Sequence, residues 1–192
     1  MDKGFTSEVR DTAMIIRFDR PKIRNPLSTP VLDALAEALG SVGASEGIKK
    51  IIFTGSNGVF ASGADLWEIA ALPPQMAAKF ATRGQELMAR IVALPQTTIA
   101  VINGYCLGGA LDLALSCERR IASNHAVFCH PGTGLGIITG WGGTQRLPRL
   151  VGSALALEIF FTAKRIDAAE ALRIGLIDEI SADPLAAAMN SV

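Results

Sequence analysis

The sequence has no excess of charge of either sign, because 18 Lys and Arg residues balance 18 Asp and Glu residues. It also has no run of basic residues of the kind that nucleic-acid-binding proteins place against phosphates. We therefore expect no nucleic acid and no other polyanion among the partners of this chain.

Long apolar segments are also missing. The N-terminal stretch MDKGFTSEVRDTAMIIRF has no apolar region long enough for a signal peptide. The longest apolar stretch, residues 97–117, is interrupted by Asn103, by glycines and by Asp112, which would be costly inside a bilayer. We expect a soluble, cytoplasmic protein with no membrane partner.

Cysteines are few, and their number is odd. Cys106, Cys117 and Cys129 are widely spaced and lie in apolar sequence. This pattern favours reduced thiols in the core over a disulfide framework.

Motifs for two common ligand classes are absent. There is no GxxxxGK[ST] phosphate loop, and GTGLGI at 132–137 does not open a helix, as a dinucleotide fingerprint should. No CxxC or HExxH pair accompanies His125, Cys129 and His130, so we expect no metal site and no separate cofactor.

Hydrophobic periodicity predicts strands that alternate with helices. Strands are expected in TAMIIRFDRP, IKKIIFTG, TTIAVIN, RRIAS, AVFCH and LIDEI. Helices are expected over 27–40 (N-cap Thr29), 66–72 (N-cap Asp65), 74–94, 109–117, 153–161 and 165–175 (N-cap Asp167, with Gly175 at C′). The alternation indicates an α/β fold with a largely parallel sheet and right-handed crossovers.

Two glycine-rich turns follow apolar strands, in IIFTGSNGVFASGAD and in IAVINGYCLGGALD. Turns at the carboxyl ends of neighbouring strands converge on one crevice, where open α/β sheets bind ligands. Glycine lets backbone N–H groups approach a ligand, and two of them aimed at one carbonyl oxygen form an oxyanion hole. The alternative is that these are simply tight turns.

Two titratable residues lie near the expected crevice. Asp112 is one turn into an apolar helix, so we expect it to be buried, with burial raising its pKa and the helix N-terminus lowering it, as suits a general acid or base. A first-turn residue that complements the helix dipole is the alternative. His130 ends a strand and could face the crevice, or it could be a hydrogen-bonded structural histidine.

Five segments, taken in order, resemble the crotonase superfamily, also called the enoyl-CoA hydratase/isomerase family. They are RNPLS, FTGSNGVFASGADL, AVINGYCLGGALDLAL, LGIITGWGGTQRLPRLVG and AAEALRIGLID, and together they cover about residues 10–180. The resemblance implies a spiral of ββα units, an acyl-CoA substrate with coenzyme A as part of it, and homotrimers or hexamers.

The resemblance also implies roles for particular positions. The backbone N–H groups of Ala64 and Gly109 would form the oxyanion hole for a thioester carbonyl. The strip that lies along coenzyme A would comprise Arg24, Pro26, Leu27, Ala61, Ser62, Asp65 and Leu66.

The chain departs from the family pattern in two places. Family hydratases carry two glutamates where this chain has Asp112 and Gly132. They also continue as C-terminal helices, so we expect a core domain at 1–182 and the start of a shortened helical region at 183–192. Ordinary hydration is therefore less expected than isomerisation, with Asp112 as the main acid/base. Decarboxylation or hydrolysis assisted by His130, and a catalytically silent acyl-CoA-binding subunit, remain alternatives.

Overall fold

A six-stranded sheet runs through the computed structural model, which describes residues 3–42, 45 and 47–191. In spatial order its strands are β1 (Phe5–Arg10), β2 (Ala13–Phe18), β4 (Lys50–Thr54), β7 (Thr97–Ile102), β9 (Arg119–Ala122) and β12 (Glu179–Ile180). All neighbours pair in parallel except β1 and β2, which form an antiparallel hairpin. The largely parallel sheet expected from the sequence is confirmed.

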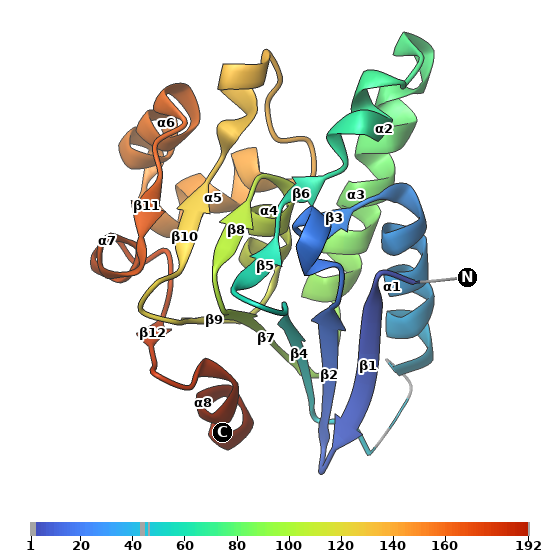
Figure 1. Ribbon diagram of the computed structural model, residues 1–192, viewed down its shortest axis with the longest axis vertical. Coiled ribbons are helices and arrows are strands. Elements are labelled where there is room, and N and C mark those ends of the chain that lie inside the picture. Colours follow the sequence, from blue (N-terminus) through green and yellow to red (C-terminus); the bar gives the residue numbers. More distant parts are fainter. Residues whose placement is uncertain (1–2, 43–44, 46, 192) are drawn as a thin grey trace.

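Smaller sheets form a second layer. One contains, in spatial order, β11 (Ile166–Asp167), β10 (Val127–Cys129), β8 (Tyr105–Leu107) and β5 (Val59–Ala61), and the other pairs β3 (Pro26–Leu27) with β6 (Gly63–Ala64). Successive segments send one strand to each layer: β4 then β5, β7 then β8, β9 then β10 (Figure 1). This repeat is the spiral of ββα units that the family resemblance implied.

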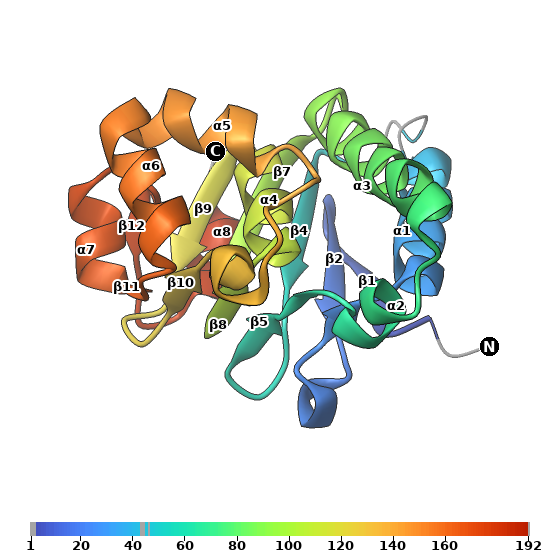
Figure 2. The same cartoon turned by 90° about the horizontal axis from the view of Figure 1, so that it is seen from above.

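Helices surround these sheets. They are α1 (Thr29–Val42), α2 (Leu66–Ala70), α3 (Ala77–Val92), α4 (Gly109–Ser116), α5 (Gly143–Val151), α6 (Ser153–Thr162), α7 (Ala168–Arg173) and α8 (Pro184–Asn190). Short 3₁₀ helices cover Pro21–Ile23, Pro74–Met76 and Pro131–Leu135. Helices α1 and α3 pack together on one side, and α5, α6 and α7 gather on the other (Figure 2). In the part of the chain that the structure describes, no helix has the length and apolar character to cross a bilayer.

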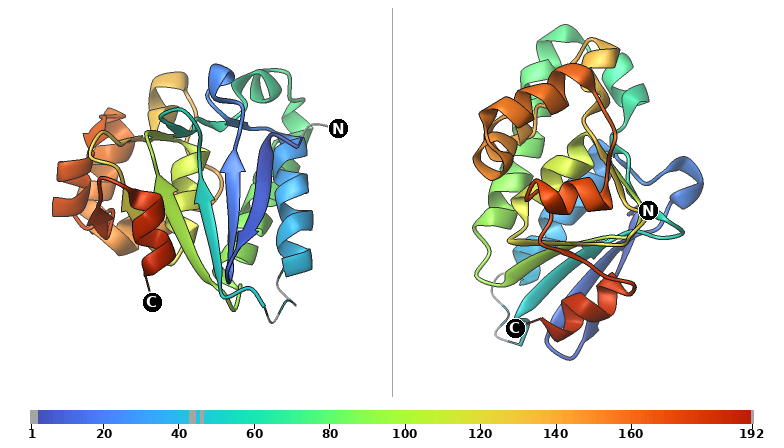
Figure 3. Two further views of the ribbon diagram at one scale, coloured as in Figure 1. Left: turned by 60° about the horizontal axis from the view of Figure 1, so that its bottom comes forward. Right: turned by 90° about the vertical axis from the view of Figure 1, so that its left-hand side faces the viewer.

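The central strands β4 and β7 are mostly apolar because both faces of the large sheet are covered. In β2, Met14 and Ile16 pack into the main core, whereas Ala13 and Ile15 face the opposite side. Helix α8 covers that opposite side through Ala188, against β7 and β9 (Figure 3).

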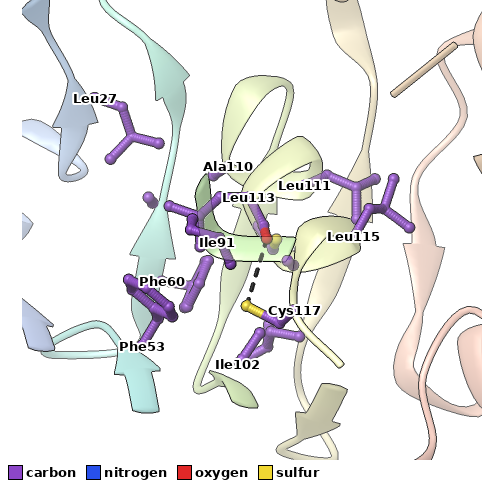
Figure 4. Packing of buried hydrophobic residues seen from close by; sticks show 14 of the residues in the cluster. Leu27, Phe53, Phe60, Ile91, Ile102, Ala110, Leu111, Leu113, Leu115 and Cys117 are labelled. Atoms are coloured by element: carbon purple, nitrogen blue, oxygen red, sulfur yellow. Dashed lines mark hydrogen bonds between the residues drawn. The ribbon is translucent and has the colours of Figure 1, made fainter. Parts of the chain in front are cut away.

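Helix α4 lies inside the main core. Its side chains are buried from Ala110 to Ser116, and Figure 4 shows its leucines among residues of the surrounding strands and helices. Cys117, just after this helix, is buried, as are Cys106 and Cys129, and all three thiols are free, as expected.

The cap predictions are confirmed with one exception. The Asp65 carboxylate accepts hydrogen bonds from the first-turn amides of α2, and Asp167 does the same for α7. Gly175 follows α7 with φ +74°, as predicted. The exception is Thr29, which was predicted to be the N-cap of α1. Thr29 is already helical, and the carbonyl of Ser28 accepts the first bond of α1 from the Leu32 amide.

Several observed elements were not predicted from the sequence. They lie in segments expected as loop or left unassigned, namely the edge strand β1, the short strands β5, β6 and β8, and helix α5. The helix expected over 74–94 is a 3₁₀ turn followed by α3, and the strand expected over 176–180 is paired only at Glu179–Ile180. Strands of two or three residues are too short to show a period.

Candidate active site

A cavity of about 300 Å³ opens where the second layer meets α2, α3, α4 and the segment 131–141. Its walls are mainly apolar. It brings together six of the residues singled out in the sequence: Ser62, Ala64, Leu66, Gly109, Asp112 and His130. Gly132, the position where family hydratases carry a glutamate, lines it as well.

One wall is backbone from the two glycine turns. At Gly63, where φ is +86°, a Cβ would lie 2.6 Å from the Leu107 carbonyl oxygen and 2.7 Å from the Gly109 nitrogen, so the two turns touch through main chain. Gly109 is the first residue of α4, and N–H groups of a first helical turn have no partner within the helix. The turns converge as expected, but at the ends of β6 and β8, one layer beyond the strands of the large sheet.

Trp141 lines the cavity and packs against this wall. The indole is 3% exposed and lies over two glycines. A Cβ on Gly109 would be 2.4 Å from its Cζ3, and a Cβ on Gly84 of α3 would be 2.2 Å from its Cδ1. The ring of Phe80 adds a tilted contact at 5.8 Å between centroids. Helices α3 and α4 can both approach Trp141 because neither has a side chain at the point of contact.

Asp112, one turn after Gly109 in α4, contributes a carboxylate to the same cavity, and it is fully buried, as expected. The Thr139 hydroxyl donates a hydrogen bond to its Oδ2, whereas Oδ1 has no hydrogen-bond partner. Burial raises the pKa of Asp112 to about 6, although the Thr139 hydroxyl, the Trp141 backbone N–H and the Arg146 charge each lower it. The carboxylate is therefore mostly ionised at neutral pH, with a proton affinity that suits a general base.

His130 lies next to this carboxylate. Its Nε2 is 3.6 Å from Asp112 Oδ1, has no hydrogen-bond partner, and its ring packs 5.1 Å from that of Phe160. Burial lowers the pKa of His130 to about 4, so the imidazole is neutral at pH 7. The side chain faces the cavity, and the expectation of a hydrogen-bonded structural histidine is not met at Nε2.

The strip expected along coenzyme A is assembled beside this cavity but mostly does not line it. Strand β3 pairs in parallel with β6, which places Pro26 opposite Gly63 and Leu27 opposite Ala64. Leu27 and Ala61 are fully buried, so their side chains face the core.

The remaining strip residues differ in exposure. Arg24 is exposed with φ +66°. The Asp65 carboxylate is used as the cap of α2, and Leu66 reaches the cavity rim at 52% exposure.

Sequence reasoning did not single out Thr139, Gly143 or Arg146. A Cβ on Gly143 would lie 2.1 Å from Asp112 Oδ1, so this glycine makes room for the carboxylate. Arg146 donates to the Trp141 carbonyl at 3.1 Å. The glycine pair after Trp141 was visible in the sequence, but nothing local linked it to Asp112, which lies about 30 residues earlier.

Comparison with known proteins supports the family resemblance described in the sequence analysis. Residues 8–189 match the family described as enoyl-CoA hydratase/isomerase. The chain belongs to this family. Within the enoyl-CoA hydratase/isomerase family, a crotonyl-CoA hydratase of Syntrophomonas wolfei is 38% identical over 174 residues, which cover 90% of this chain and 67% of that protein. A short-chain-enoyl-CoA hydratase of Clostridium acetobutylicum is 39% identical, over 86% of this chain and 64% of its own length.

Solved structures of the family share the fold. The crystal structure of enoyl-CoA hydratase from Thermoplasma volcanium superposes with a TM-score of 0.93 at 32% identity, covering 98% of this chain and 75% of that one. The chain thus spans about two thirds of the length of the two curated relatives named above.

Proposed function

We propose that this chain carries the active site of an acyl-CoA enzyme that stabilises a thioester enolate and transfers a proton with Asp112. The observation that supports this most directly is the cavity itself. Ala64, Gly109 and Asp112 all line it, and Asp112 Oδ1 has no hydrogen-bond partner.

In this mechanism, the thioester carbonyl oxygen accepts hydrogen bonds from the N–H groups of Ala64 and Gly109. Asp112 Oδ1 removes a proton from the carbon next to the carbonyl, the C–H electron pair forms the enolate, and the two N–H groups stabilise the negative charge on oxygen. Return of the proton to the same carbon gives exchange, and its return to the γ-carbon of an unsaturated acyl chain gives isomerisation.

Proton transfer between carbons fits this cavity better than hydration. Among the residues that line it, Asp112 and His130 have titratable side chains, and His130 is neutral at pH 7. Gly132 offers no group to activate water, and a Cβ at this position would lie 2.7 Å from the Ile137 carbonyl oxygen. Replacing Gly132 with glutamate therefore requires the segment 132–137 to move.

The test follows the conversion of 3-butenoyl-CoA to crotonyl-CoA through the conjugated enoyl absorbance, with hydration of crotonyl-CoA measured in parallel. Asp112→Asn should lower turnover by about 10²- to 10⁴-fold, because general acid–base catalysis contributes about that much. The dissociation constant for crotonyl-CoA should stay within a few-fold of the original value.

Glu118→Gln is the matched control, because Glu118 is an exposed acid just beyond the same helix. Saturable crotonyl-CoA binding without turnover of either acyl-CoA would identify a silent binding subunit instead. Equal turnover in the Asp112→Asn variant and the unmodified protein would exclude Asp112 as the base.

The assembly belongs to the same proposal. We expect homotrimers or dimers of trimers, as the family resemblance implies. Light scattering coupled to size-exclusion chromatography measures the mass directly, and a monomer would contradict this expectation.

A further inference from the structure

The two oxygens of the Asp112 carboxylate have different environments. Oδ2 accepts the hydrogen bond from Thr139, which comes from the segment between the 3₁₀ helix Pro131–Leu135 and α5. Oδ1 has no hydrogen-bond partner, is 3.6 Å from His130 Nε2, and belongs to a residue that lines the cavity. One oxygen is thus hydrogen-bonded by the protein, and the other is buried without a partner between His130 and the backbone of Gly143.

We propose that Thr139 is a positioning residue whose hydroxyl holds Oδ2 and thereby presents Oδ1 to the substrate. This inference rests on the proposed role of Asp112 as the base. The terminal torsion of an aspartate is broad, so the carboxylate of a free side chain rotates easily. A hydrogen bond to one oxygen selects one orientation, and proton transfer depends on such orientation.

The surrounding packing supports an oriented Thr139 hydroxyl. A Cβ on Gly143 would lie 2.1 Å from Asp112 Oδ1 and 2.9 Å from Thr139 Cγ2, so both side chains lie against the backbone of Gly143. The branched side chain of threonine has a restricted first torsion. With its methyl group against Gly143, the hydroxyl of Thr139 is directed at the carboxylate.

Three charged or titratable side chains of the described residues interact with Asp112 and enter the expected pH dependence. His130 lies beside it at the end of β10, Arg146 acts from α5, and the Cys106 thiol on β8 interacts with it electrostatically. The Thr139 hydrogen bond lowers the pKa of Asp112, so its removal should raise that pKa further. The group must be ionised to act as a base, and the acidic limb of the rate profile should therefore move to higher pH.

The experiment compares Thr139→Val and Thr139→Ala, which remove the donor, with Thr139→Ser, which keeps it. The first readout is deuterium incorporation at the α-carbon of butyryl-CoA in D₂O, followed by NMR as kcat, KM and a pH profile. The second readout is the titration of the Asp112 carboxyl carbon, by ¹³C NMR of the protein without ligand. Thr82→Val, an exposed position on α3, is the control for removing a hydroxyl.

We expect Thr139→Val and Thr139→Ala to lower kcat about tenfold or more, since hydrogen bonds to charged groups contribute that much. KM should change little, the acidic limb and the carboxyl titration should both move to higher pH, and Thr139→Ser should retain most of the rate. Equal rates and coincident titrations in all variants would overturn the proposal, as would a loss in Thr139→Ser equal to that in Thr139→Val.

The two readouts separate this inference from the proposed function. If the unmodified protein exchanges no deuterium, the proposed function fails. The carboxyl titration still tests Thr139 in that case. A shift to higher pH in Thr139→Val supports the hydrogen bond as the orienting contact, and unchanged curves exclude it.

Discussion

The two walls of the cavity present their polar groups in different ways. The wall of Ala64 and Gly109 is main chain where two turns are in contact, and we propose its N–H groups as the polar groups there. On the wall of Asp112 they are side-chain atoms, two of which have no hydrogen-bond partner. The first wall depends on the absence of side chains, and the second depends on a few particular ones. Each should respond to substitution in its own way.

After the loss given above for Asp112→Asn, the largest effect on turnover is expected on the backbone wall. A Cβ in Gly109→Ala would be 2.4 Å from Trp141 Cζ3, so either the indole or the start of α4 must move. A displacement of about 1 Å at a catalytic group can cost about a hundredfold in rate, and we expect at least that loss in turnover of 3-butenoyl-CoA.

The double variant Gly109→Ala/Trp141→Ala tests the cause of that loss. It removes the collision and should recover part of the rate, which a double-mutant cycle measures. Gly134→Ala is the control, because a Cβ there meets nothing within 4 Å. Unchanged turnover in Gly109→Ala would show that the turn is not constrained by Trp141.

Substitution of Asp112 on the side-chain wall should change how the free energy of unfolding depends on pH. The pKa of Asp112 in the folded chain, about 6, is raised above its ordinary value of 3.8, so this group loses stabilising free energy as pH rises from about 4 to about 6. An asparagine does not titrate. Two pKa units correspond to about 3 kcal/mol, and Asp112→Asn should gain that much over the unmodified protein between pH 4 and pH 7.5.

Urea unfolding of both proteins at several pH values measures this difference. His130, whose folded pKa is lowered, is present in both proteins, so its contribution, lost as pH falls from about 6.5 towards 4, largely cancels. Parallel profiles of the free energy of unfolding against pH in the two proteins would mean that burial does not raise the pKa of Asp112.

The smallest effect is expected from the more distant charge. Arg146 lowers the pKa of Asp112, so Arg146→Gln should raise it and move the acidic limb of kcat/KM slightly upward. Arg149→Gln on the same helix is the matched control, since Arg149 is exposed and does not contribute to the pKa of Asp112. If the acidic limb of kcat/KM is the same in both variants, burial and hydrogen bonding alone determine the pKa of Asp112.

The same contrast explains what the sequence could predict. The turns before Ala64 and Gly109, and the buried acid at 112, carry local signals, namely glycines after apolar strands and a carboxylate in an apolar helix. The partner of Asp112 carries none. Thr139 lies in a glycine-rich segment that resembles any exposed loop, and only the chain path through β9 and β10 brings it to α4.

The approach of His130 to Asp112 was likewise decided by the pairing of β10 with β8 in the second layer. Of the strands in this layer, β10 was predicted within AVFCH, whereas its neighbours of two or three residues have no detectable period. The family resemblance anticipated the layer as part of a spiral, but the orientation of individual side chains required the structure.

Trp141 has a consequence for how this chain can change. Its indole occupies the volume that side chains at Gly84 and Gly109 would need, and it joins α3 to the start of α4. The side chains at positions 84, 109 and 141 therefore compete for the same space. A larger residue at 84 would displace the indole and, through it, the backbone at Gly109. A smaller residue at 141 would leave room for a side chain at each of the two glycine positions.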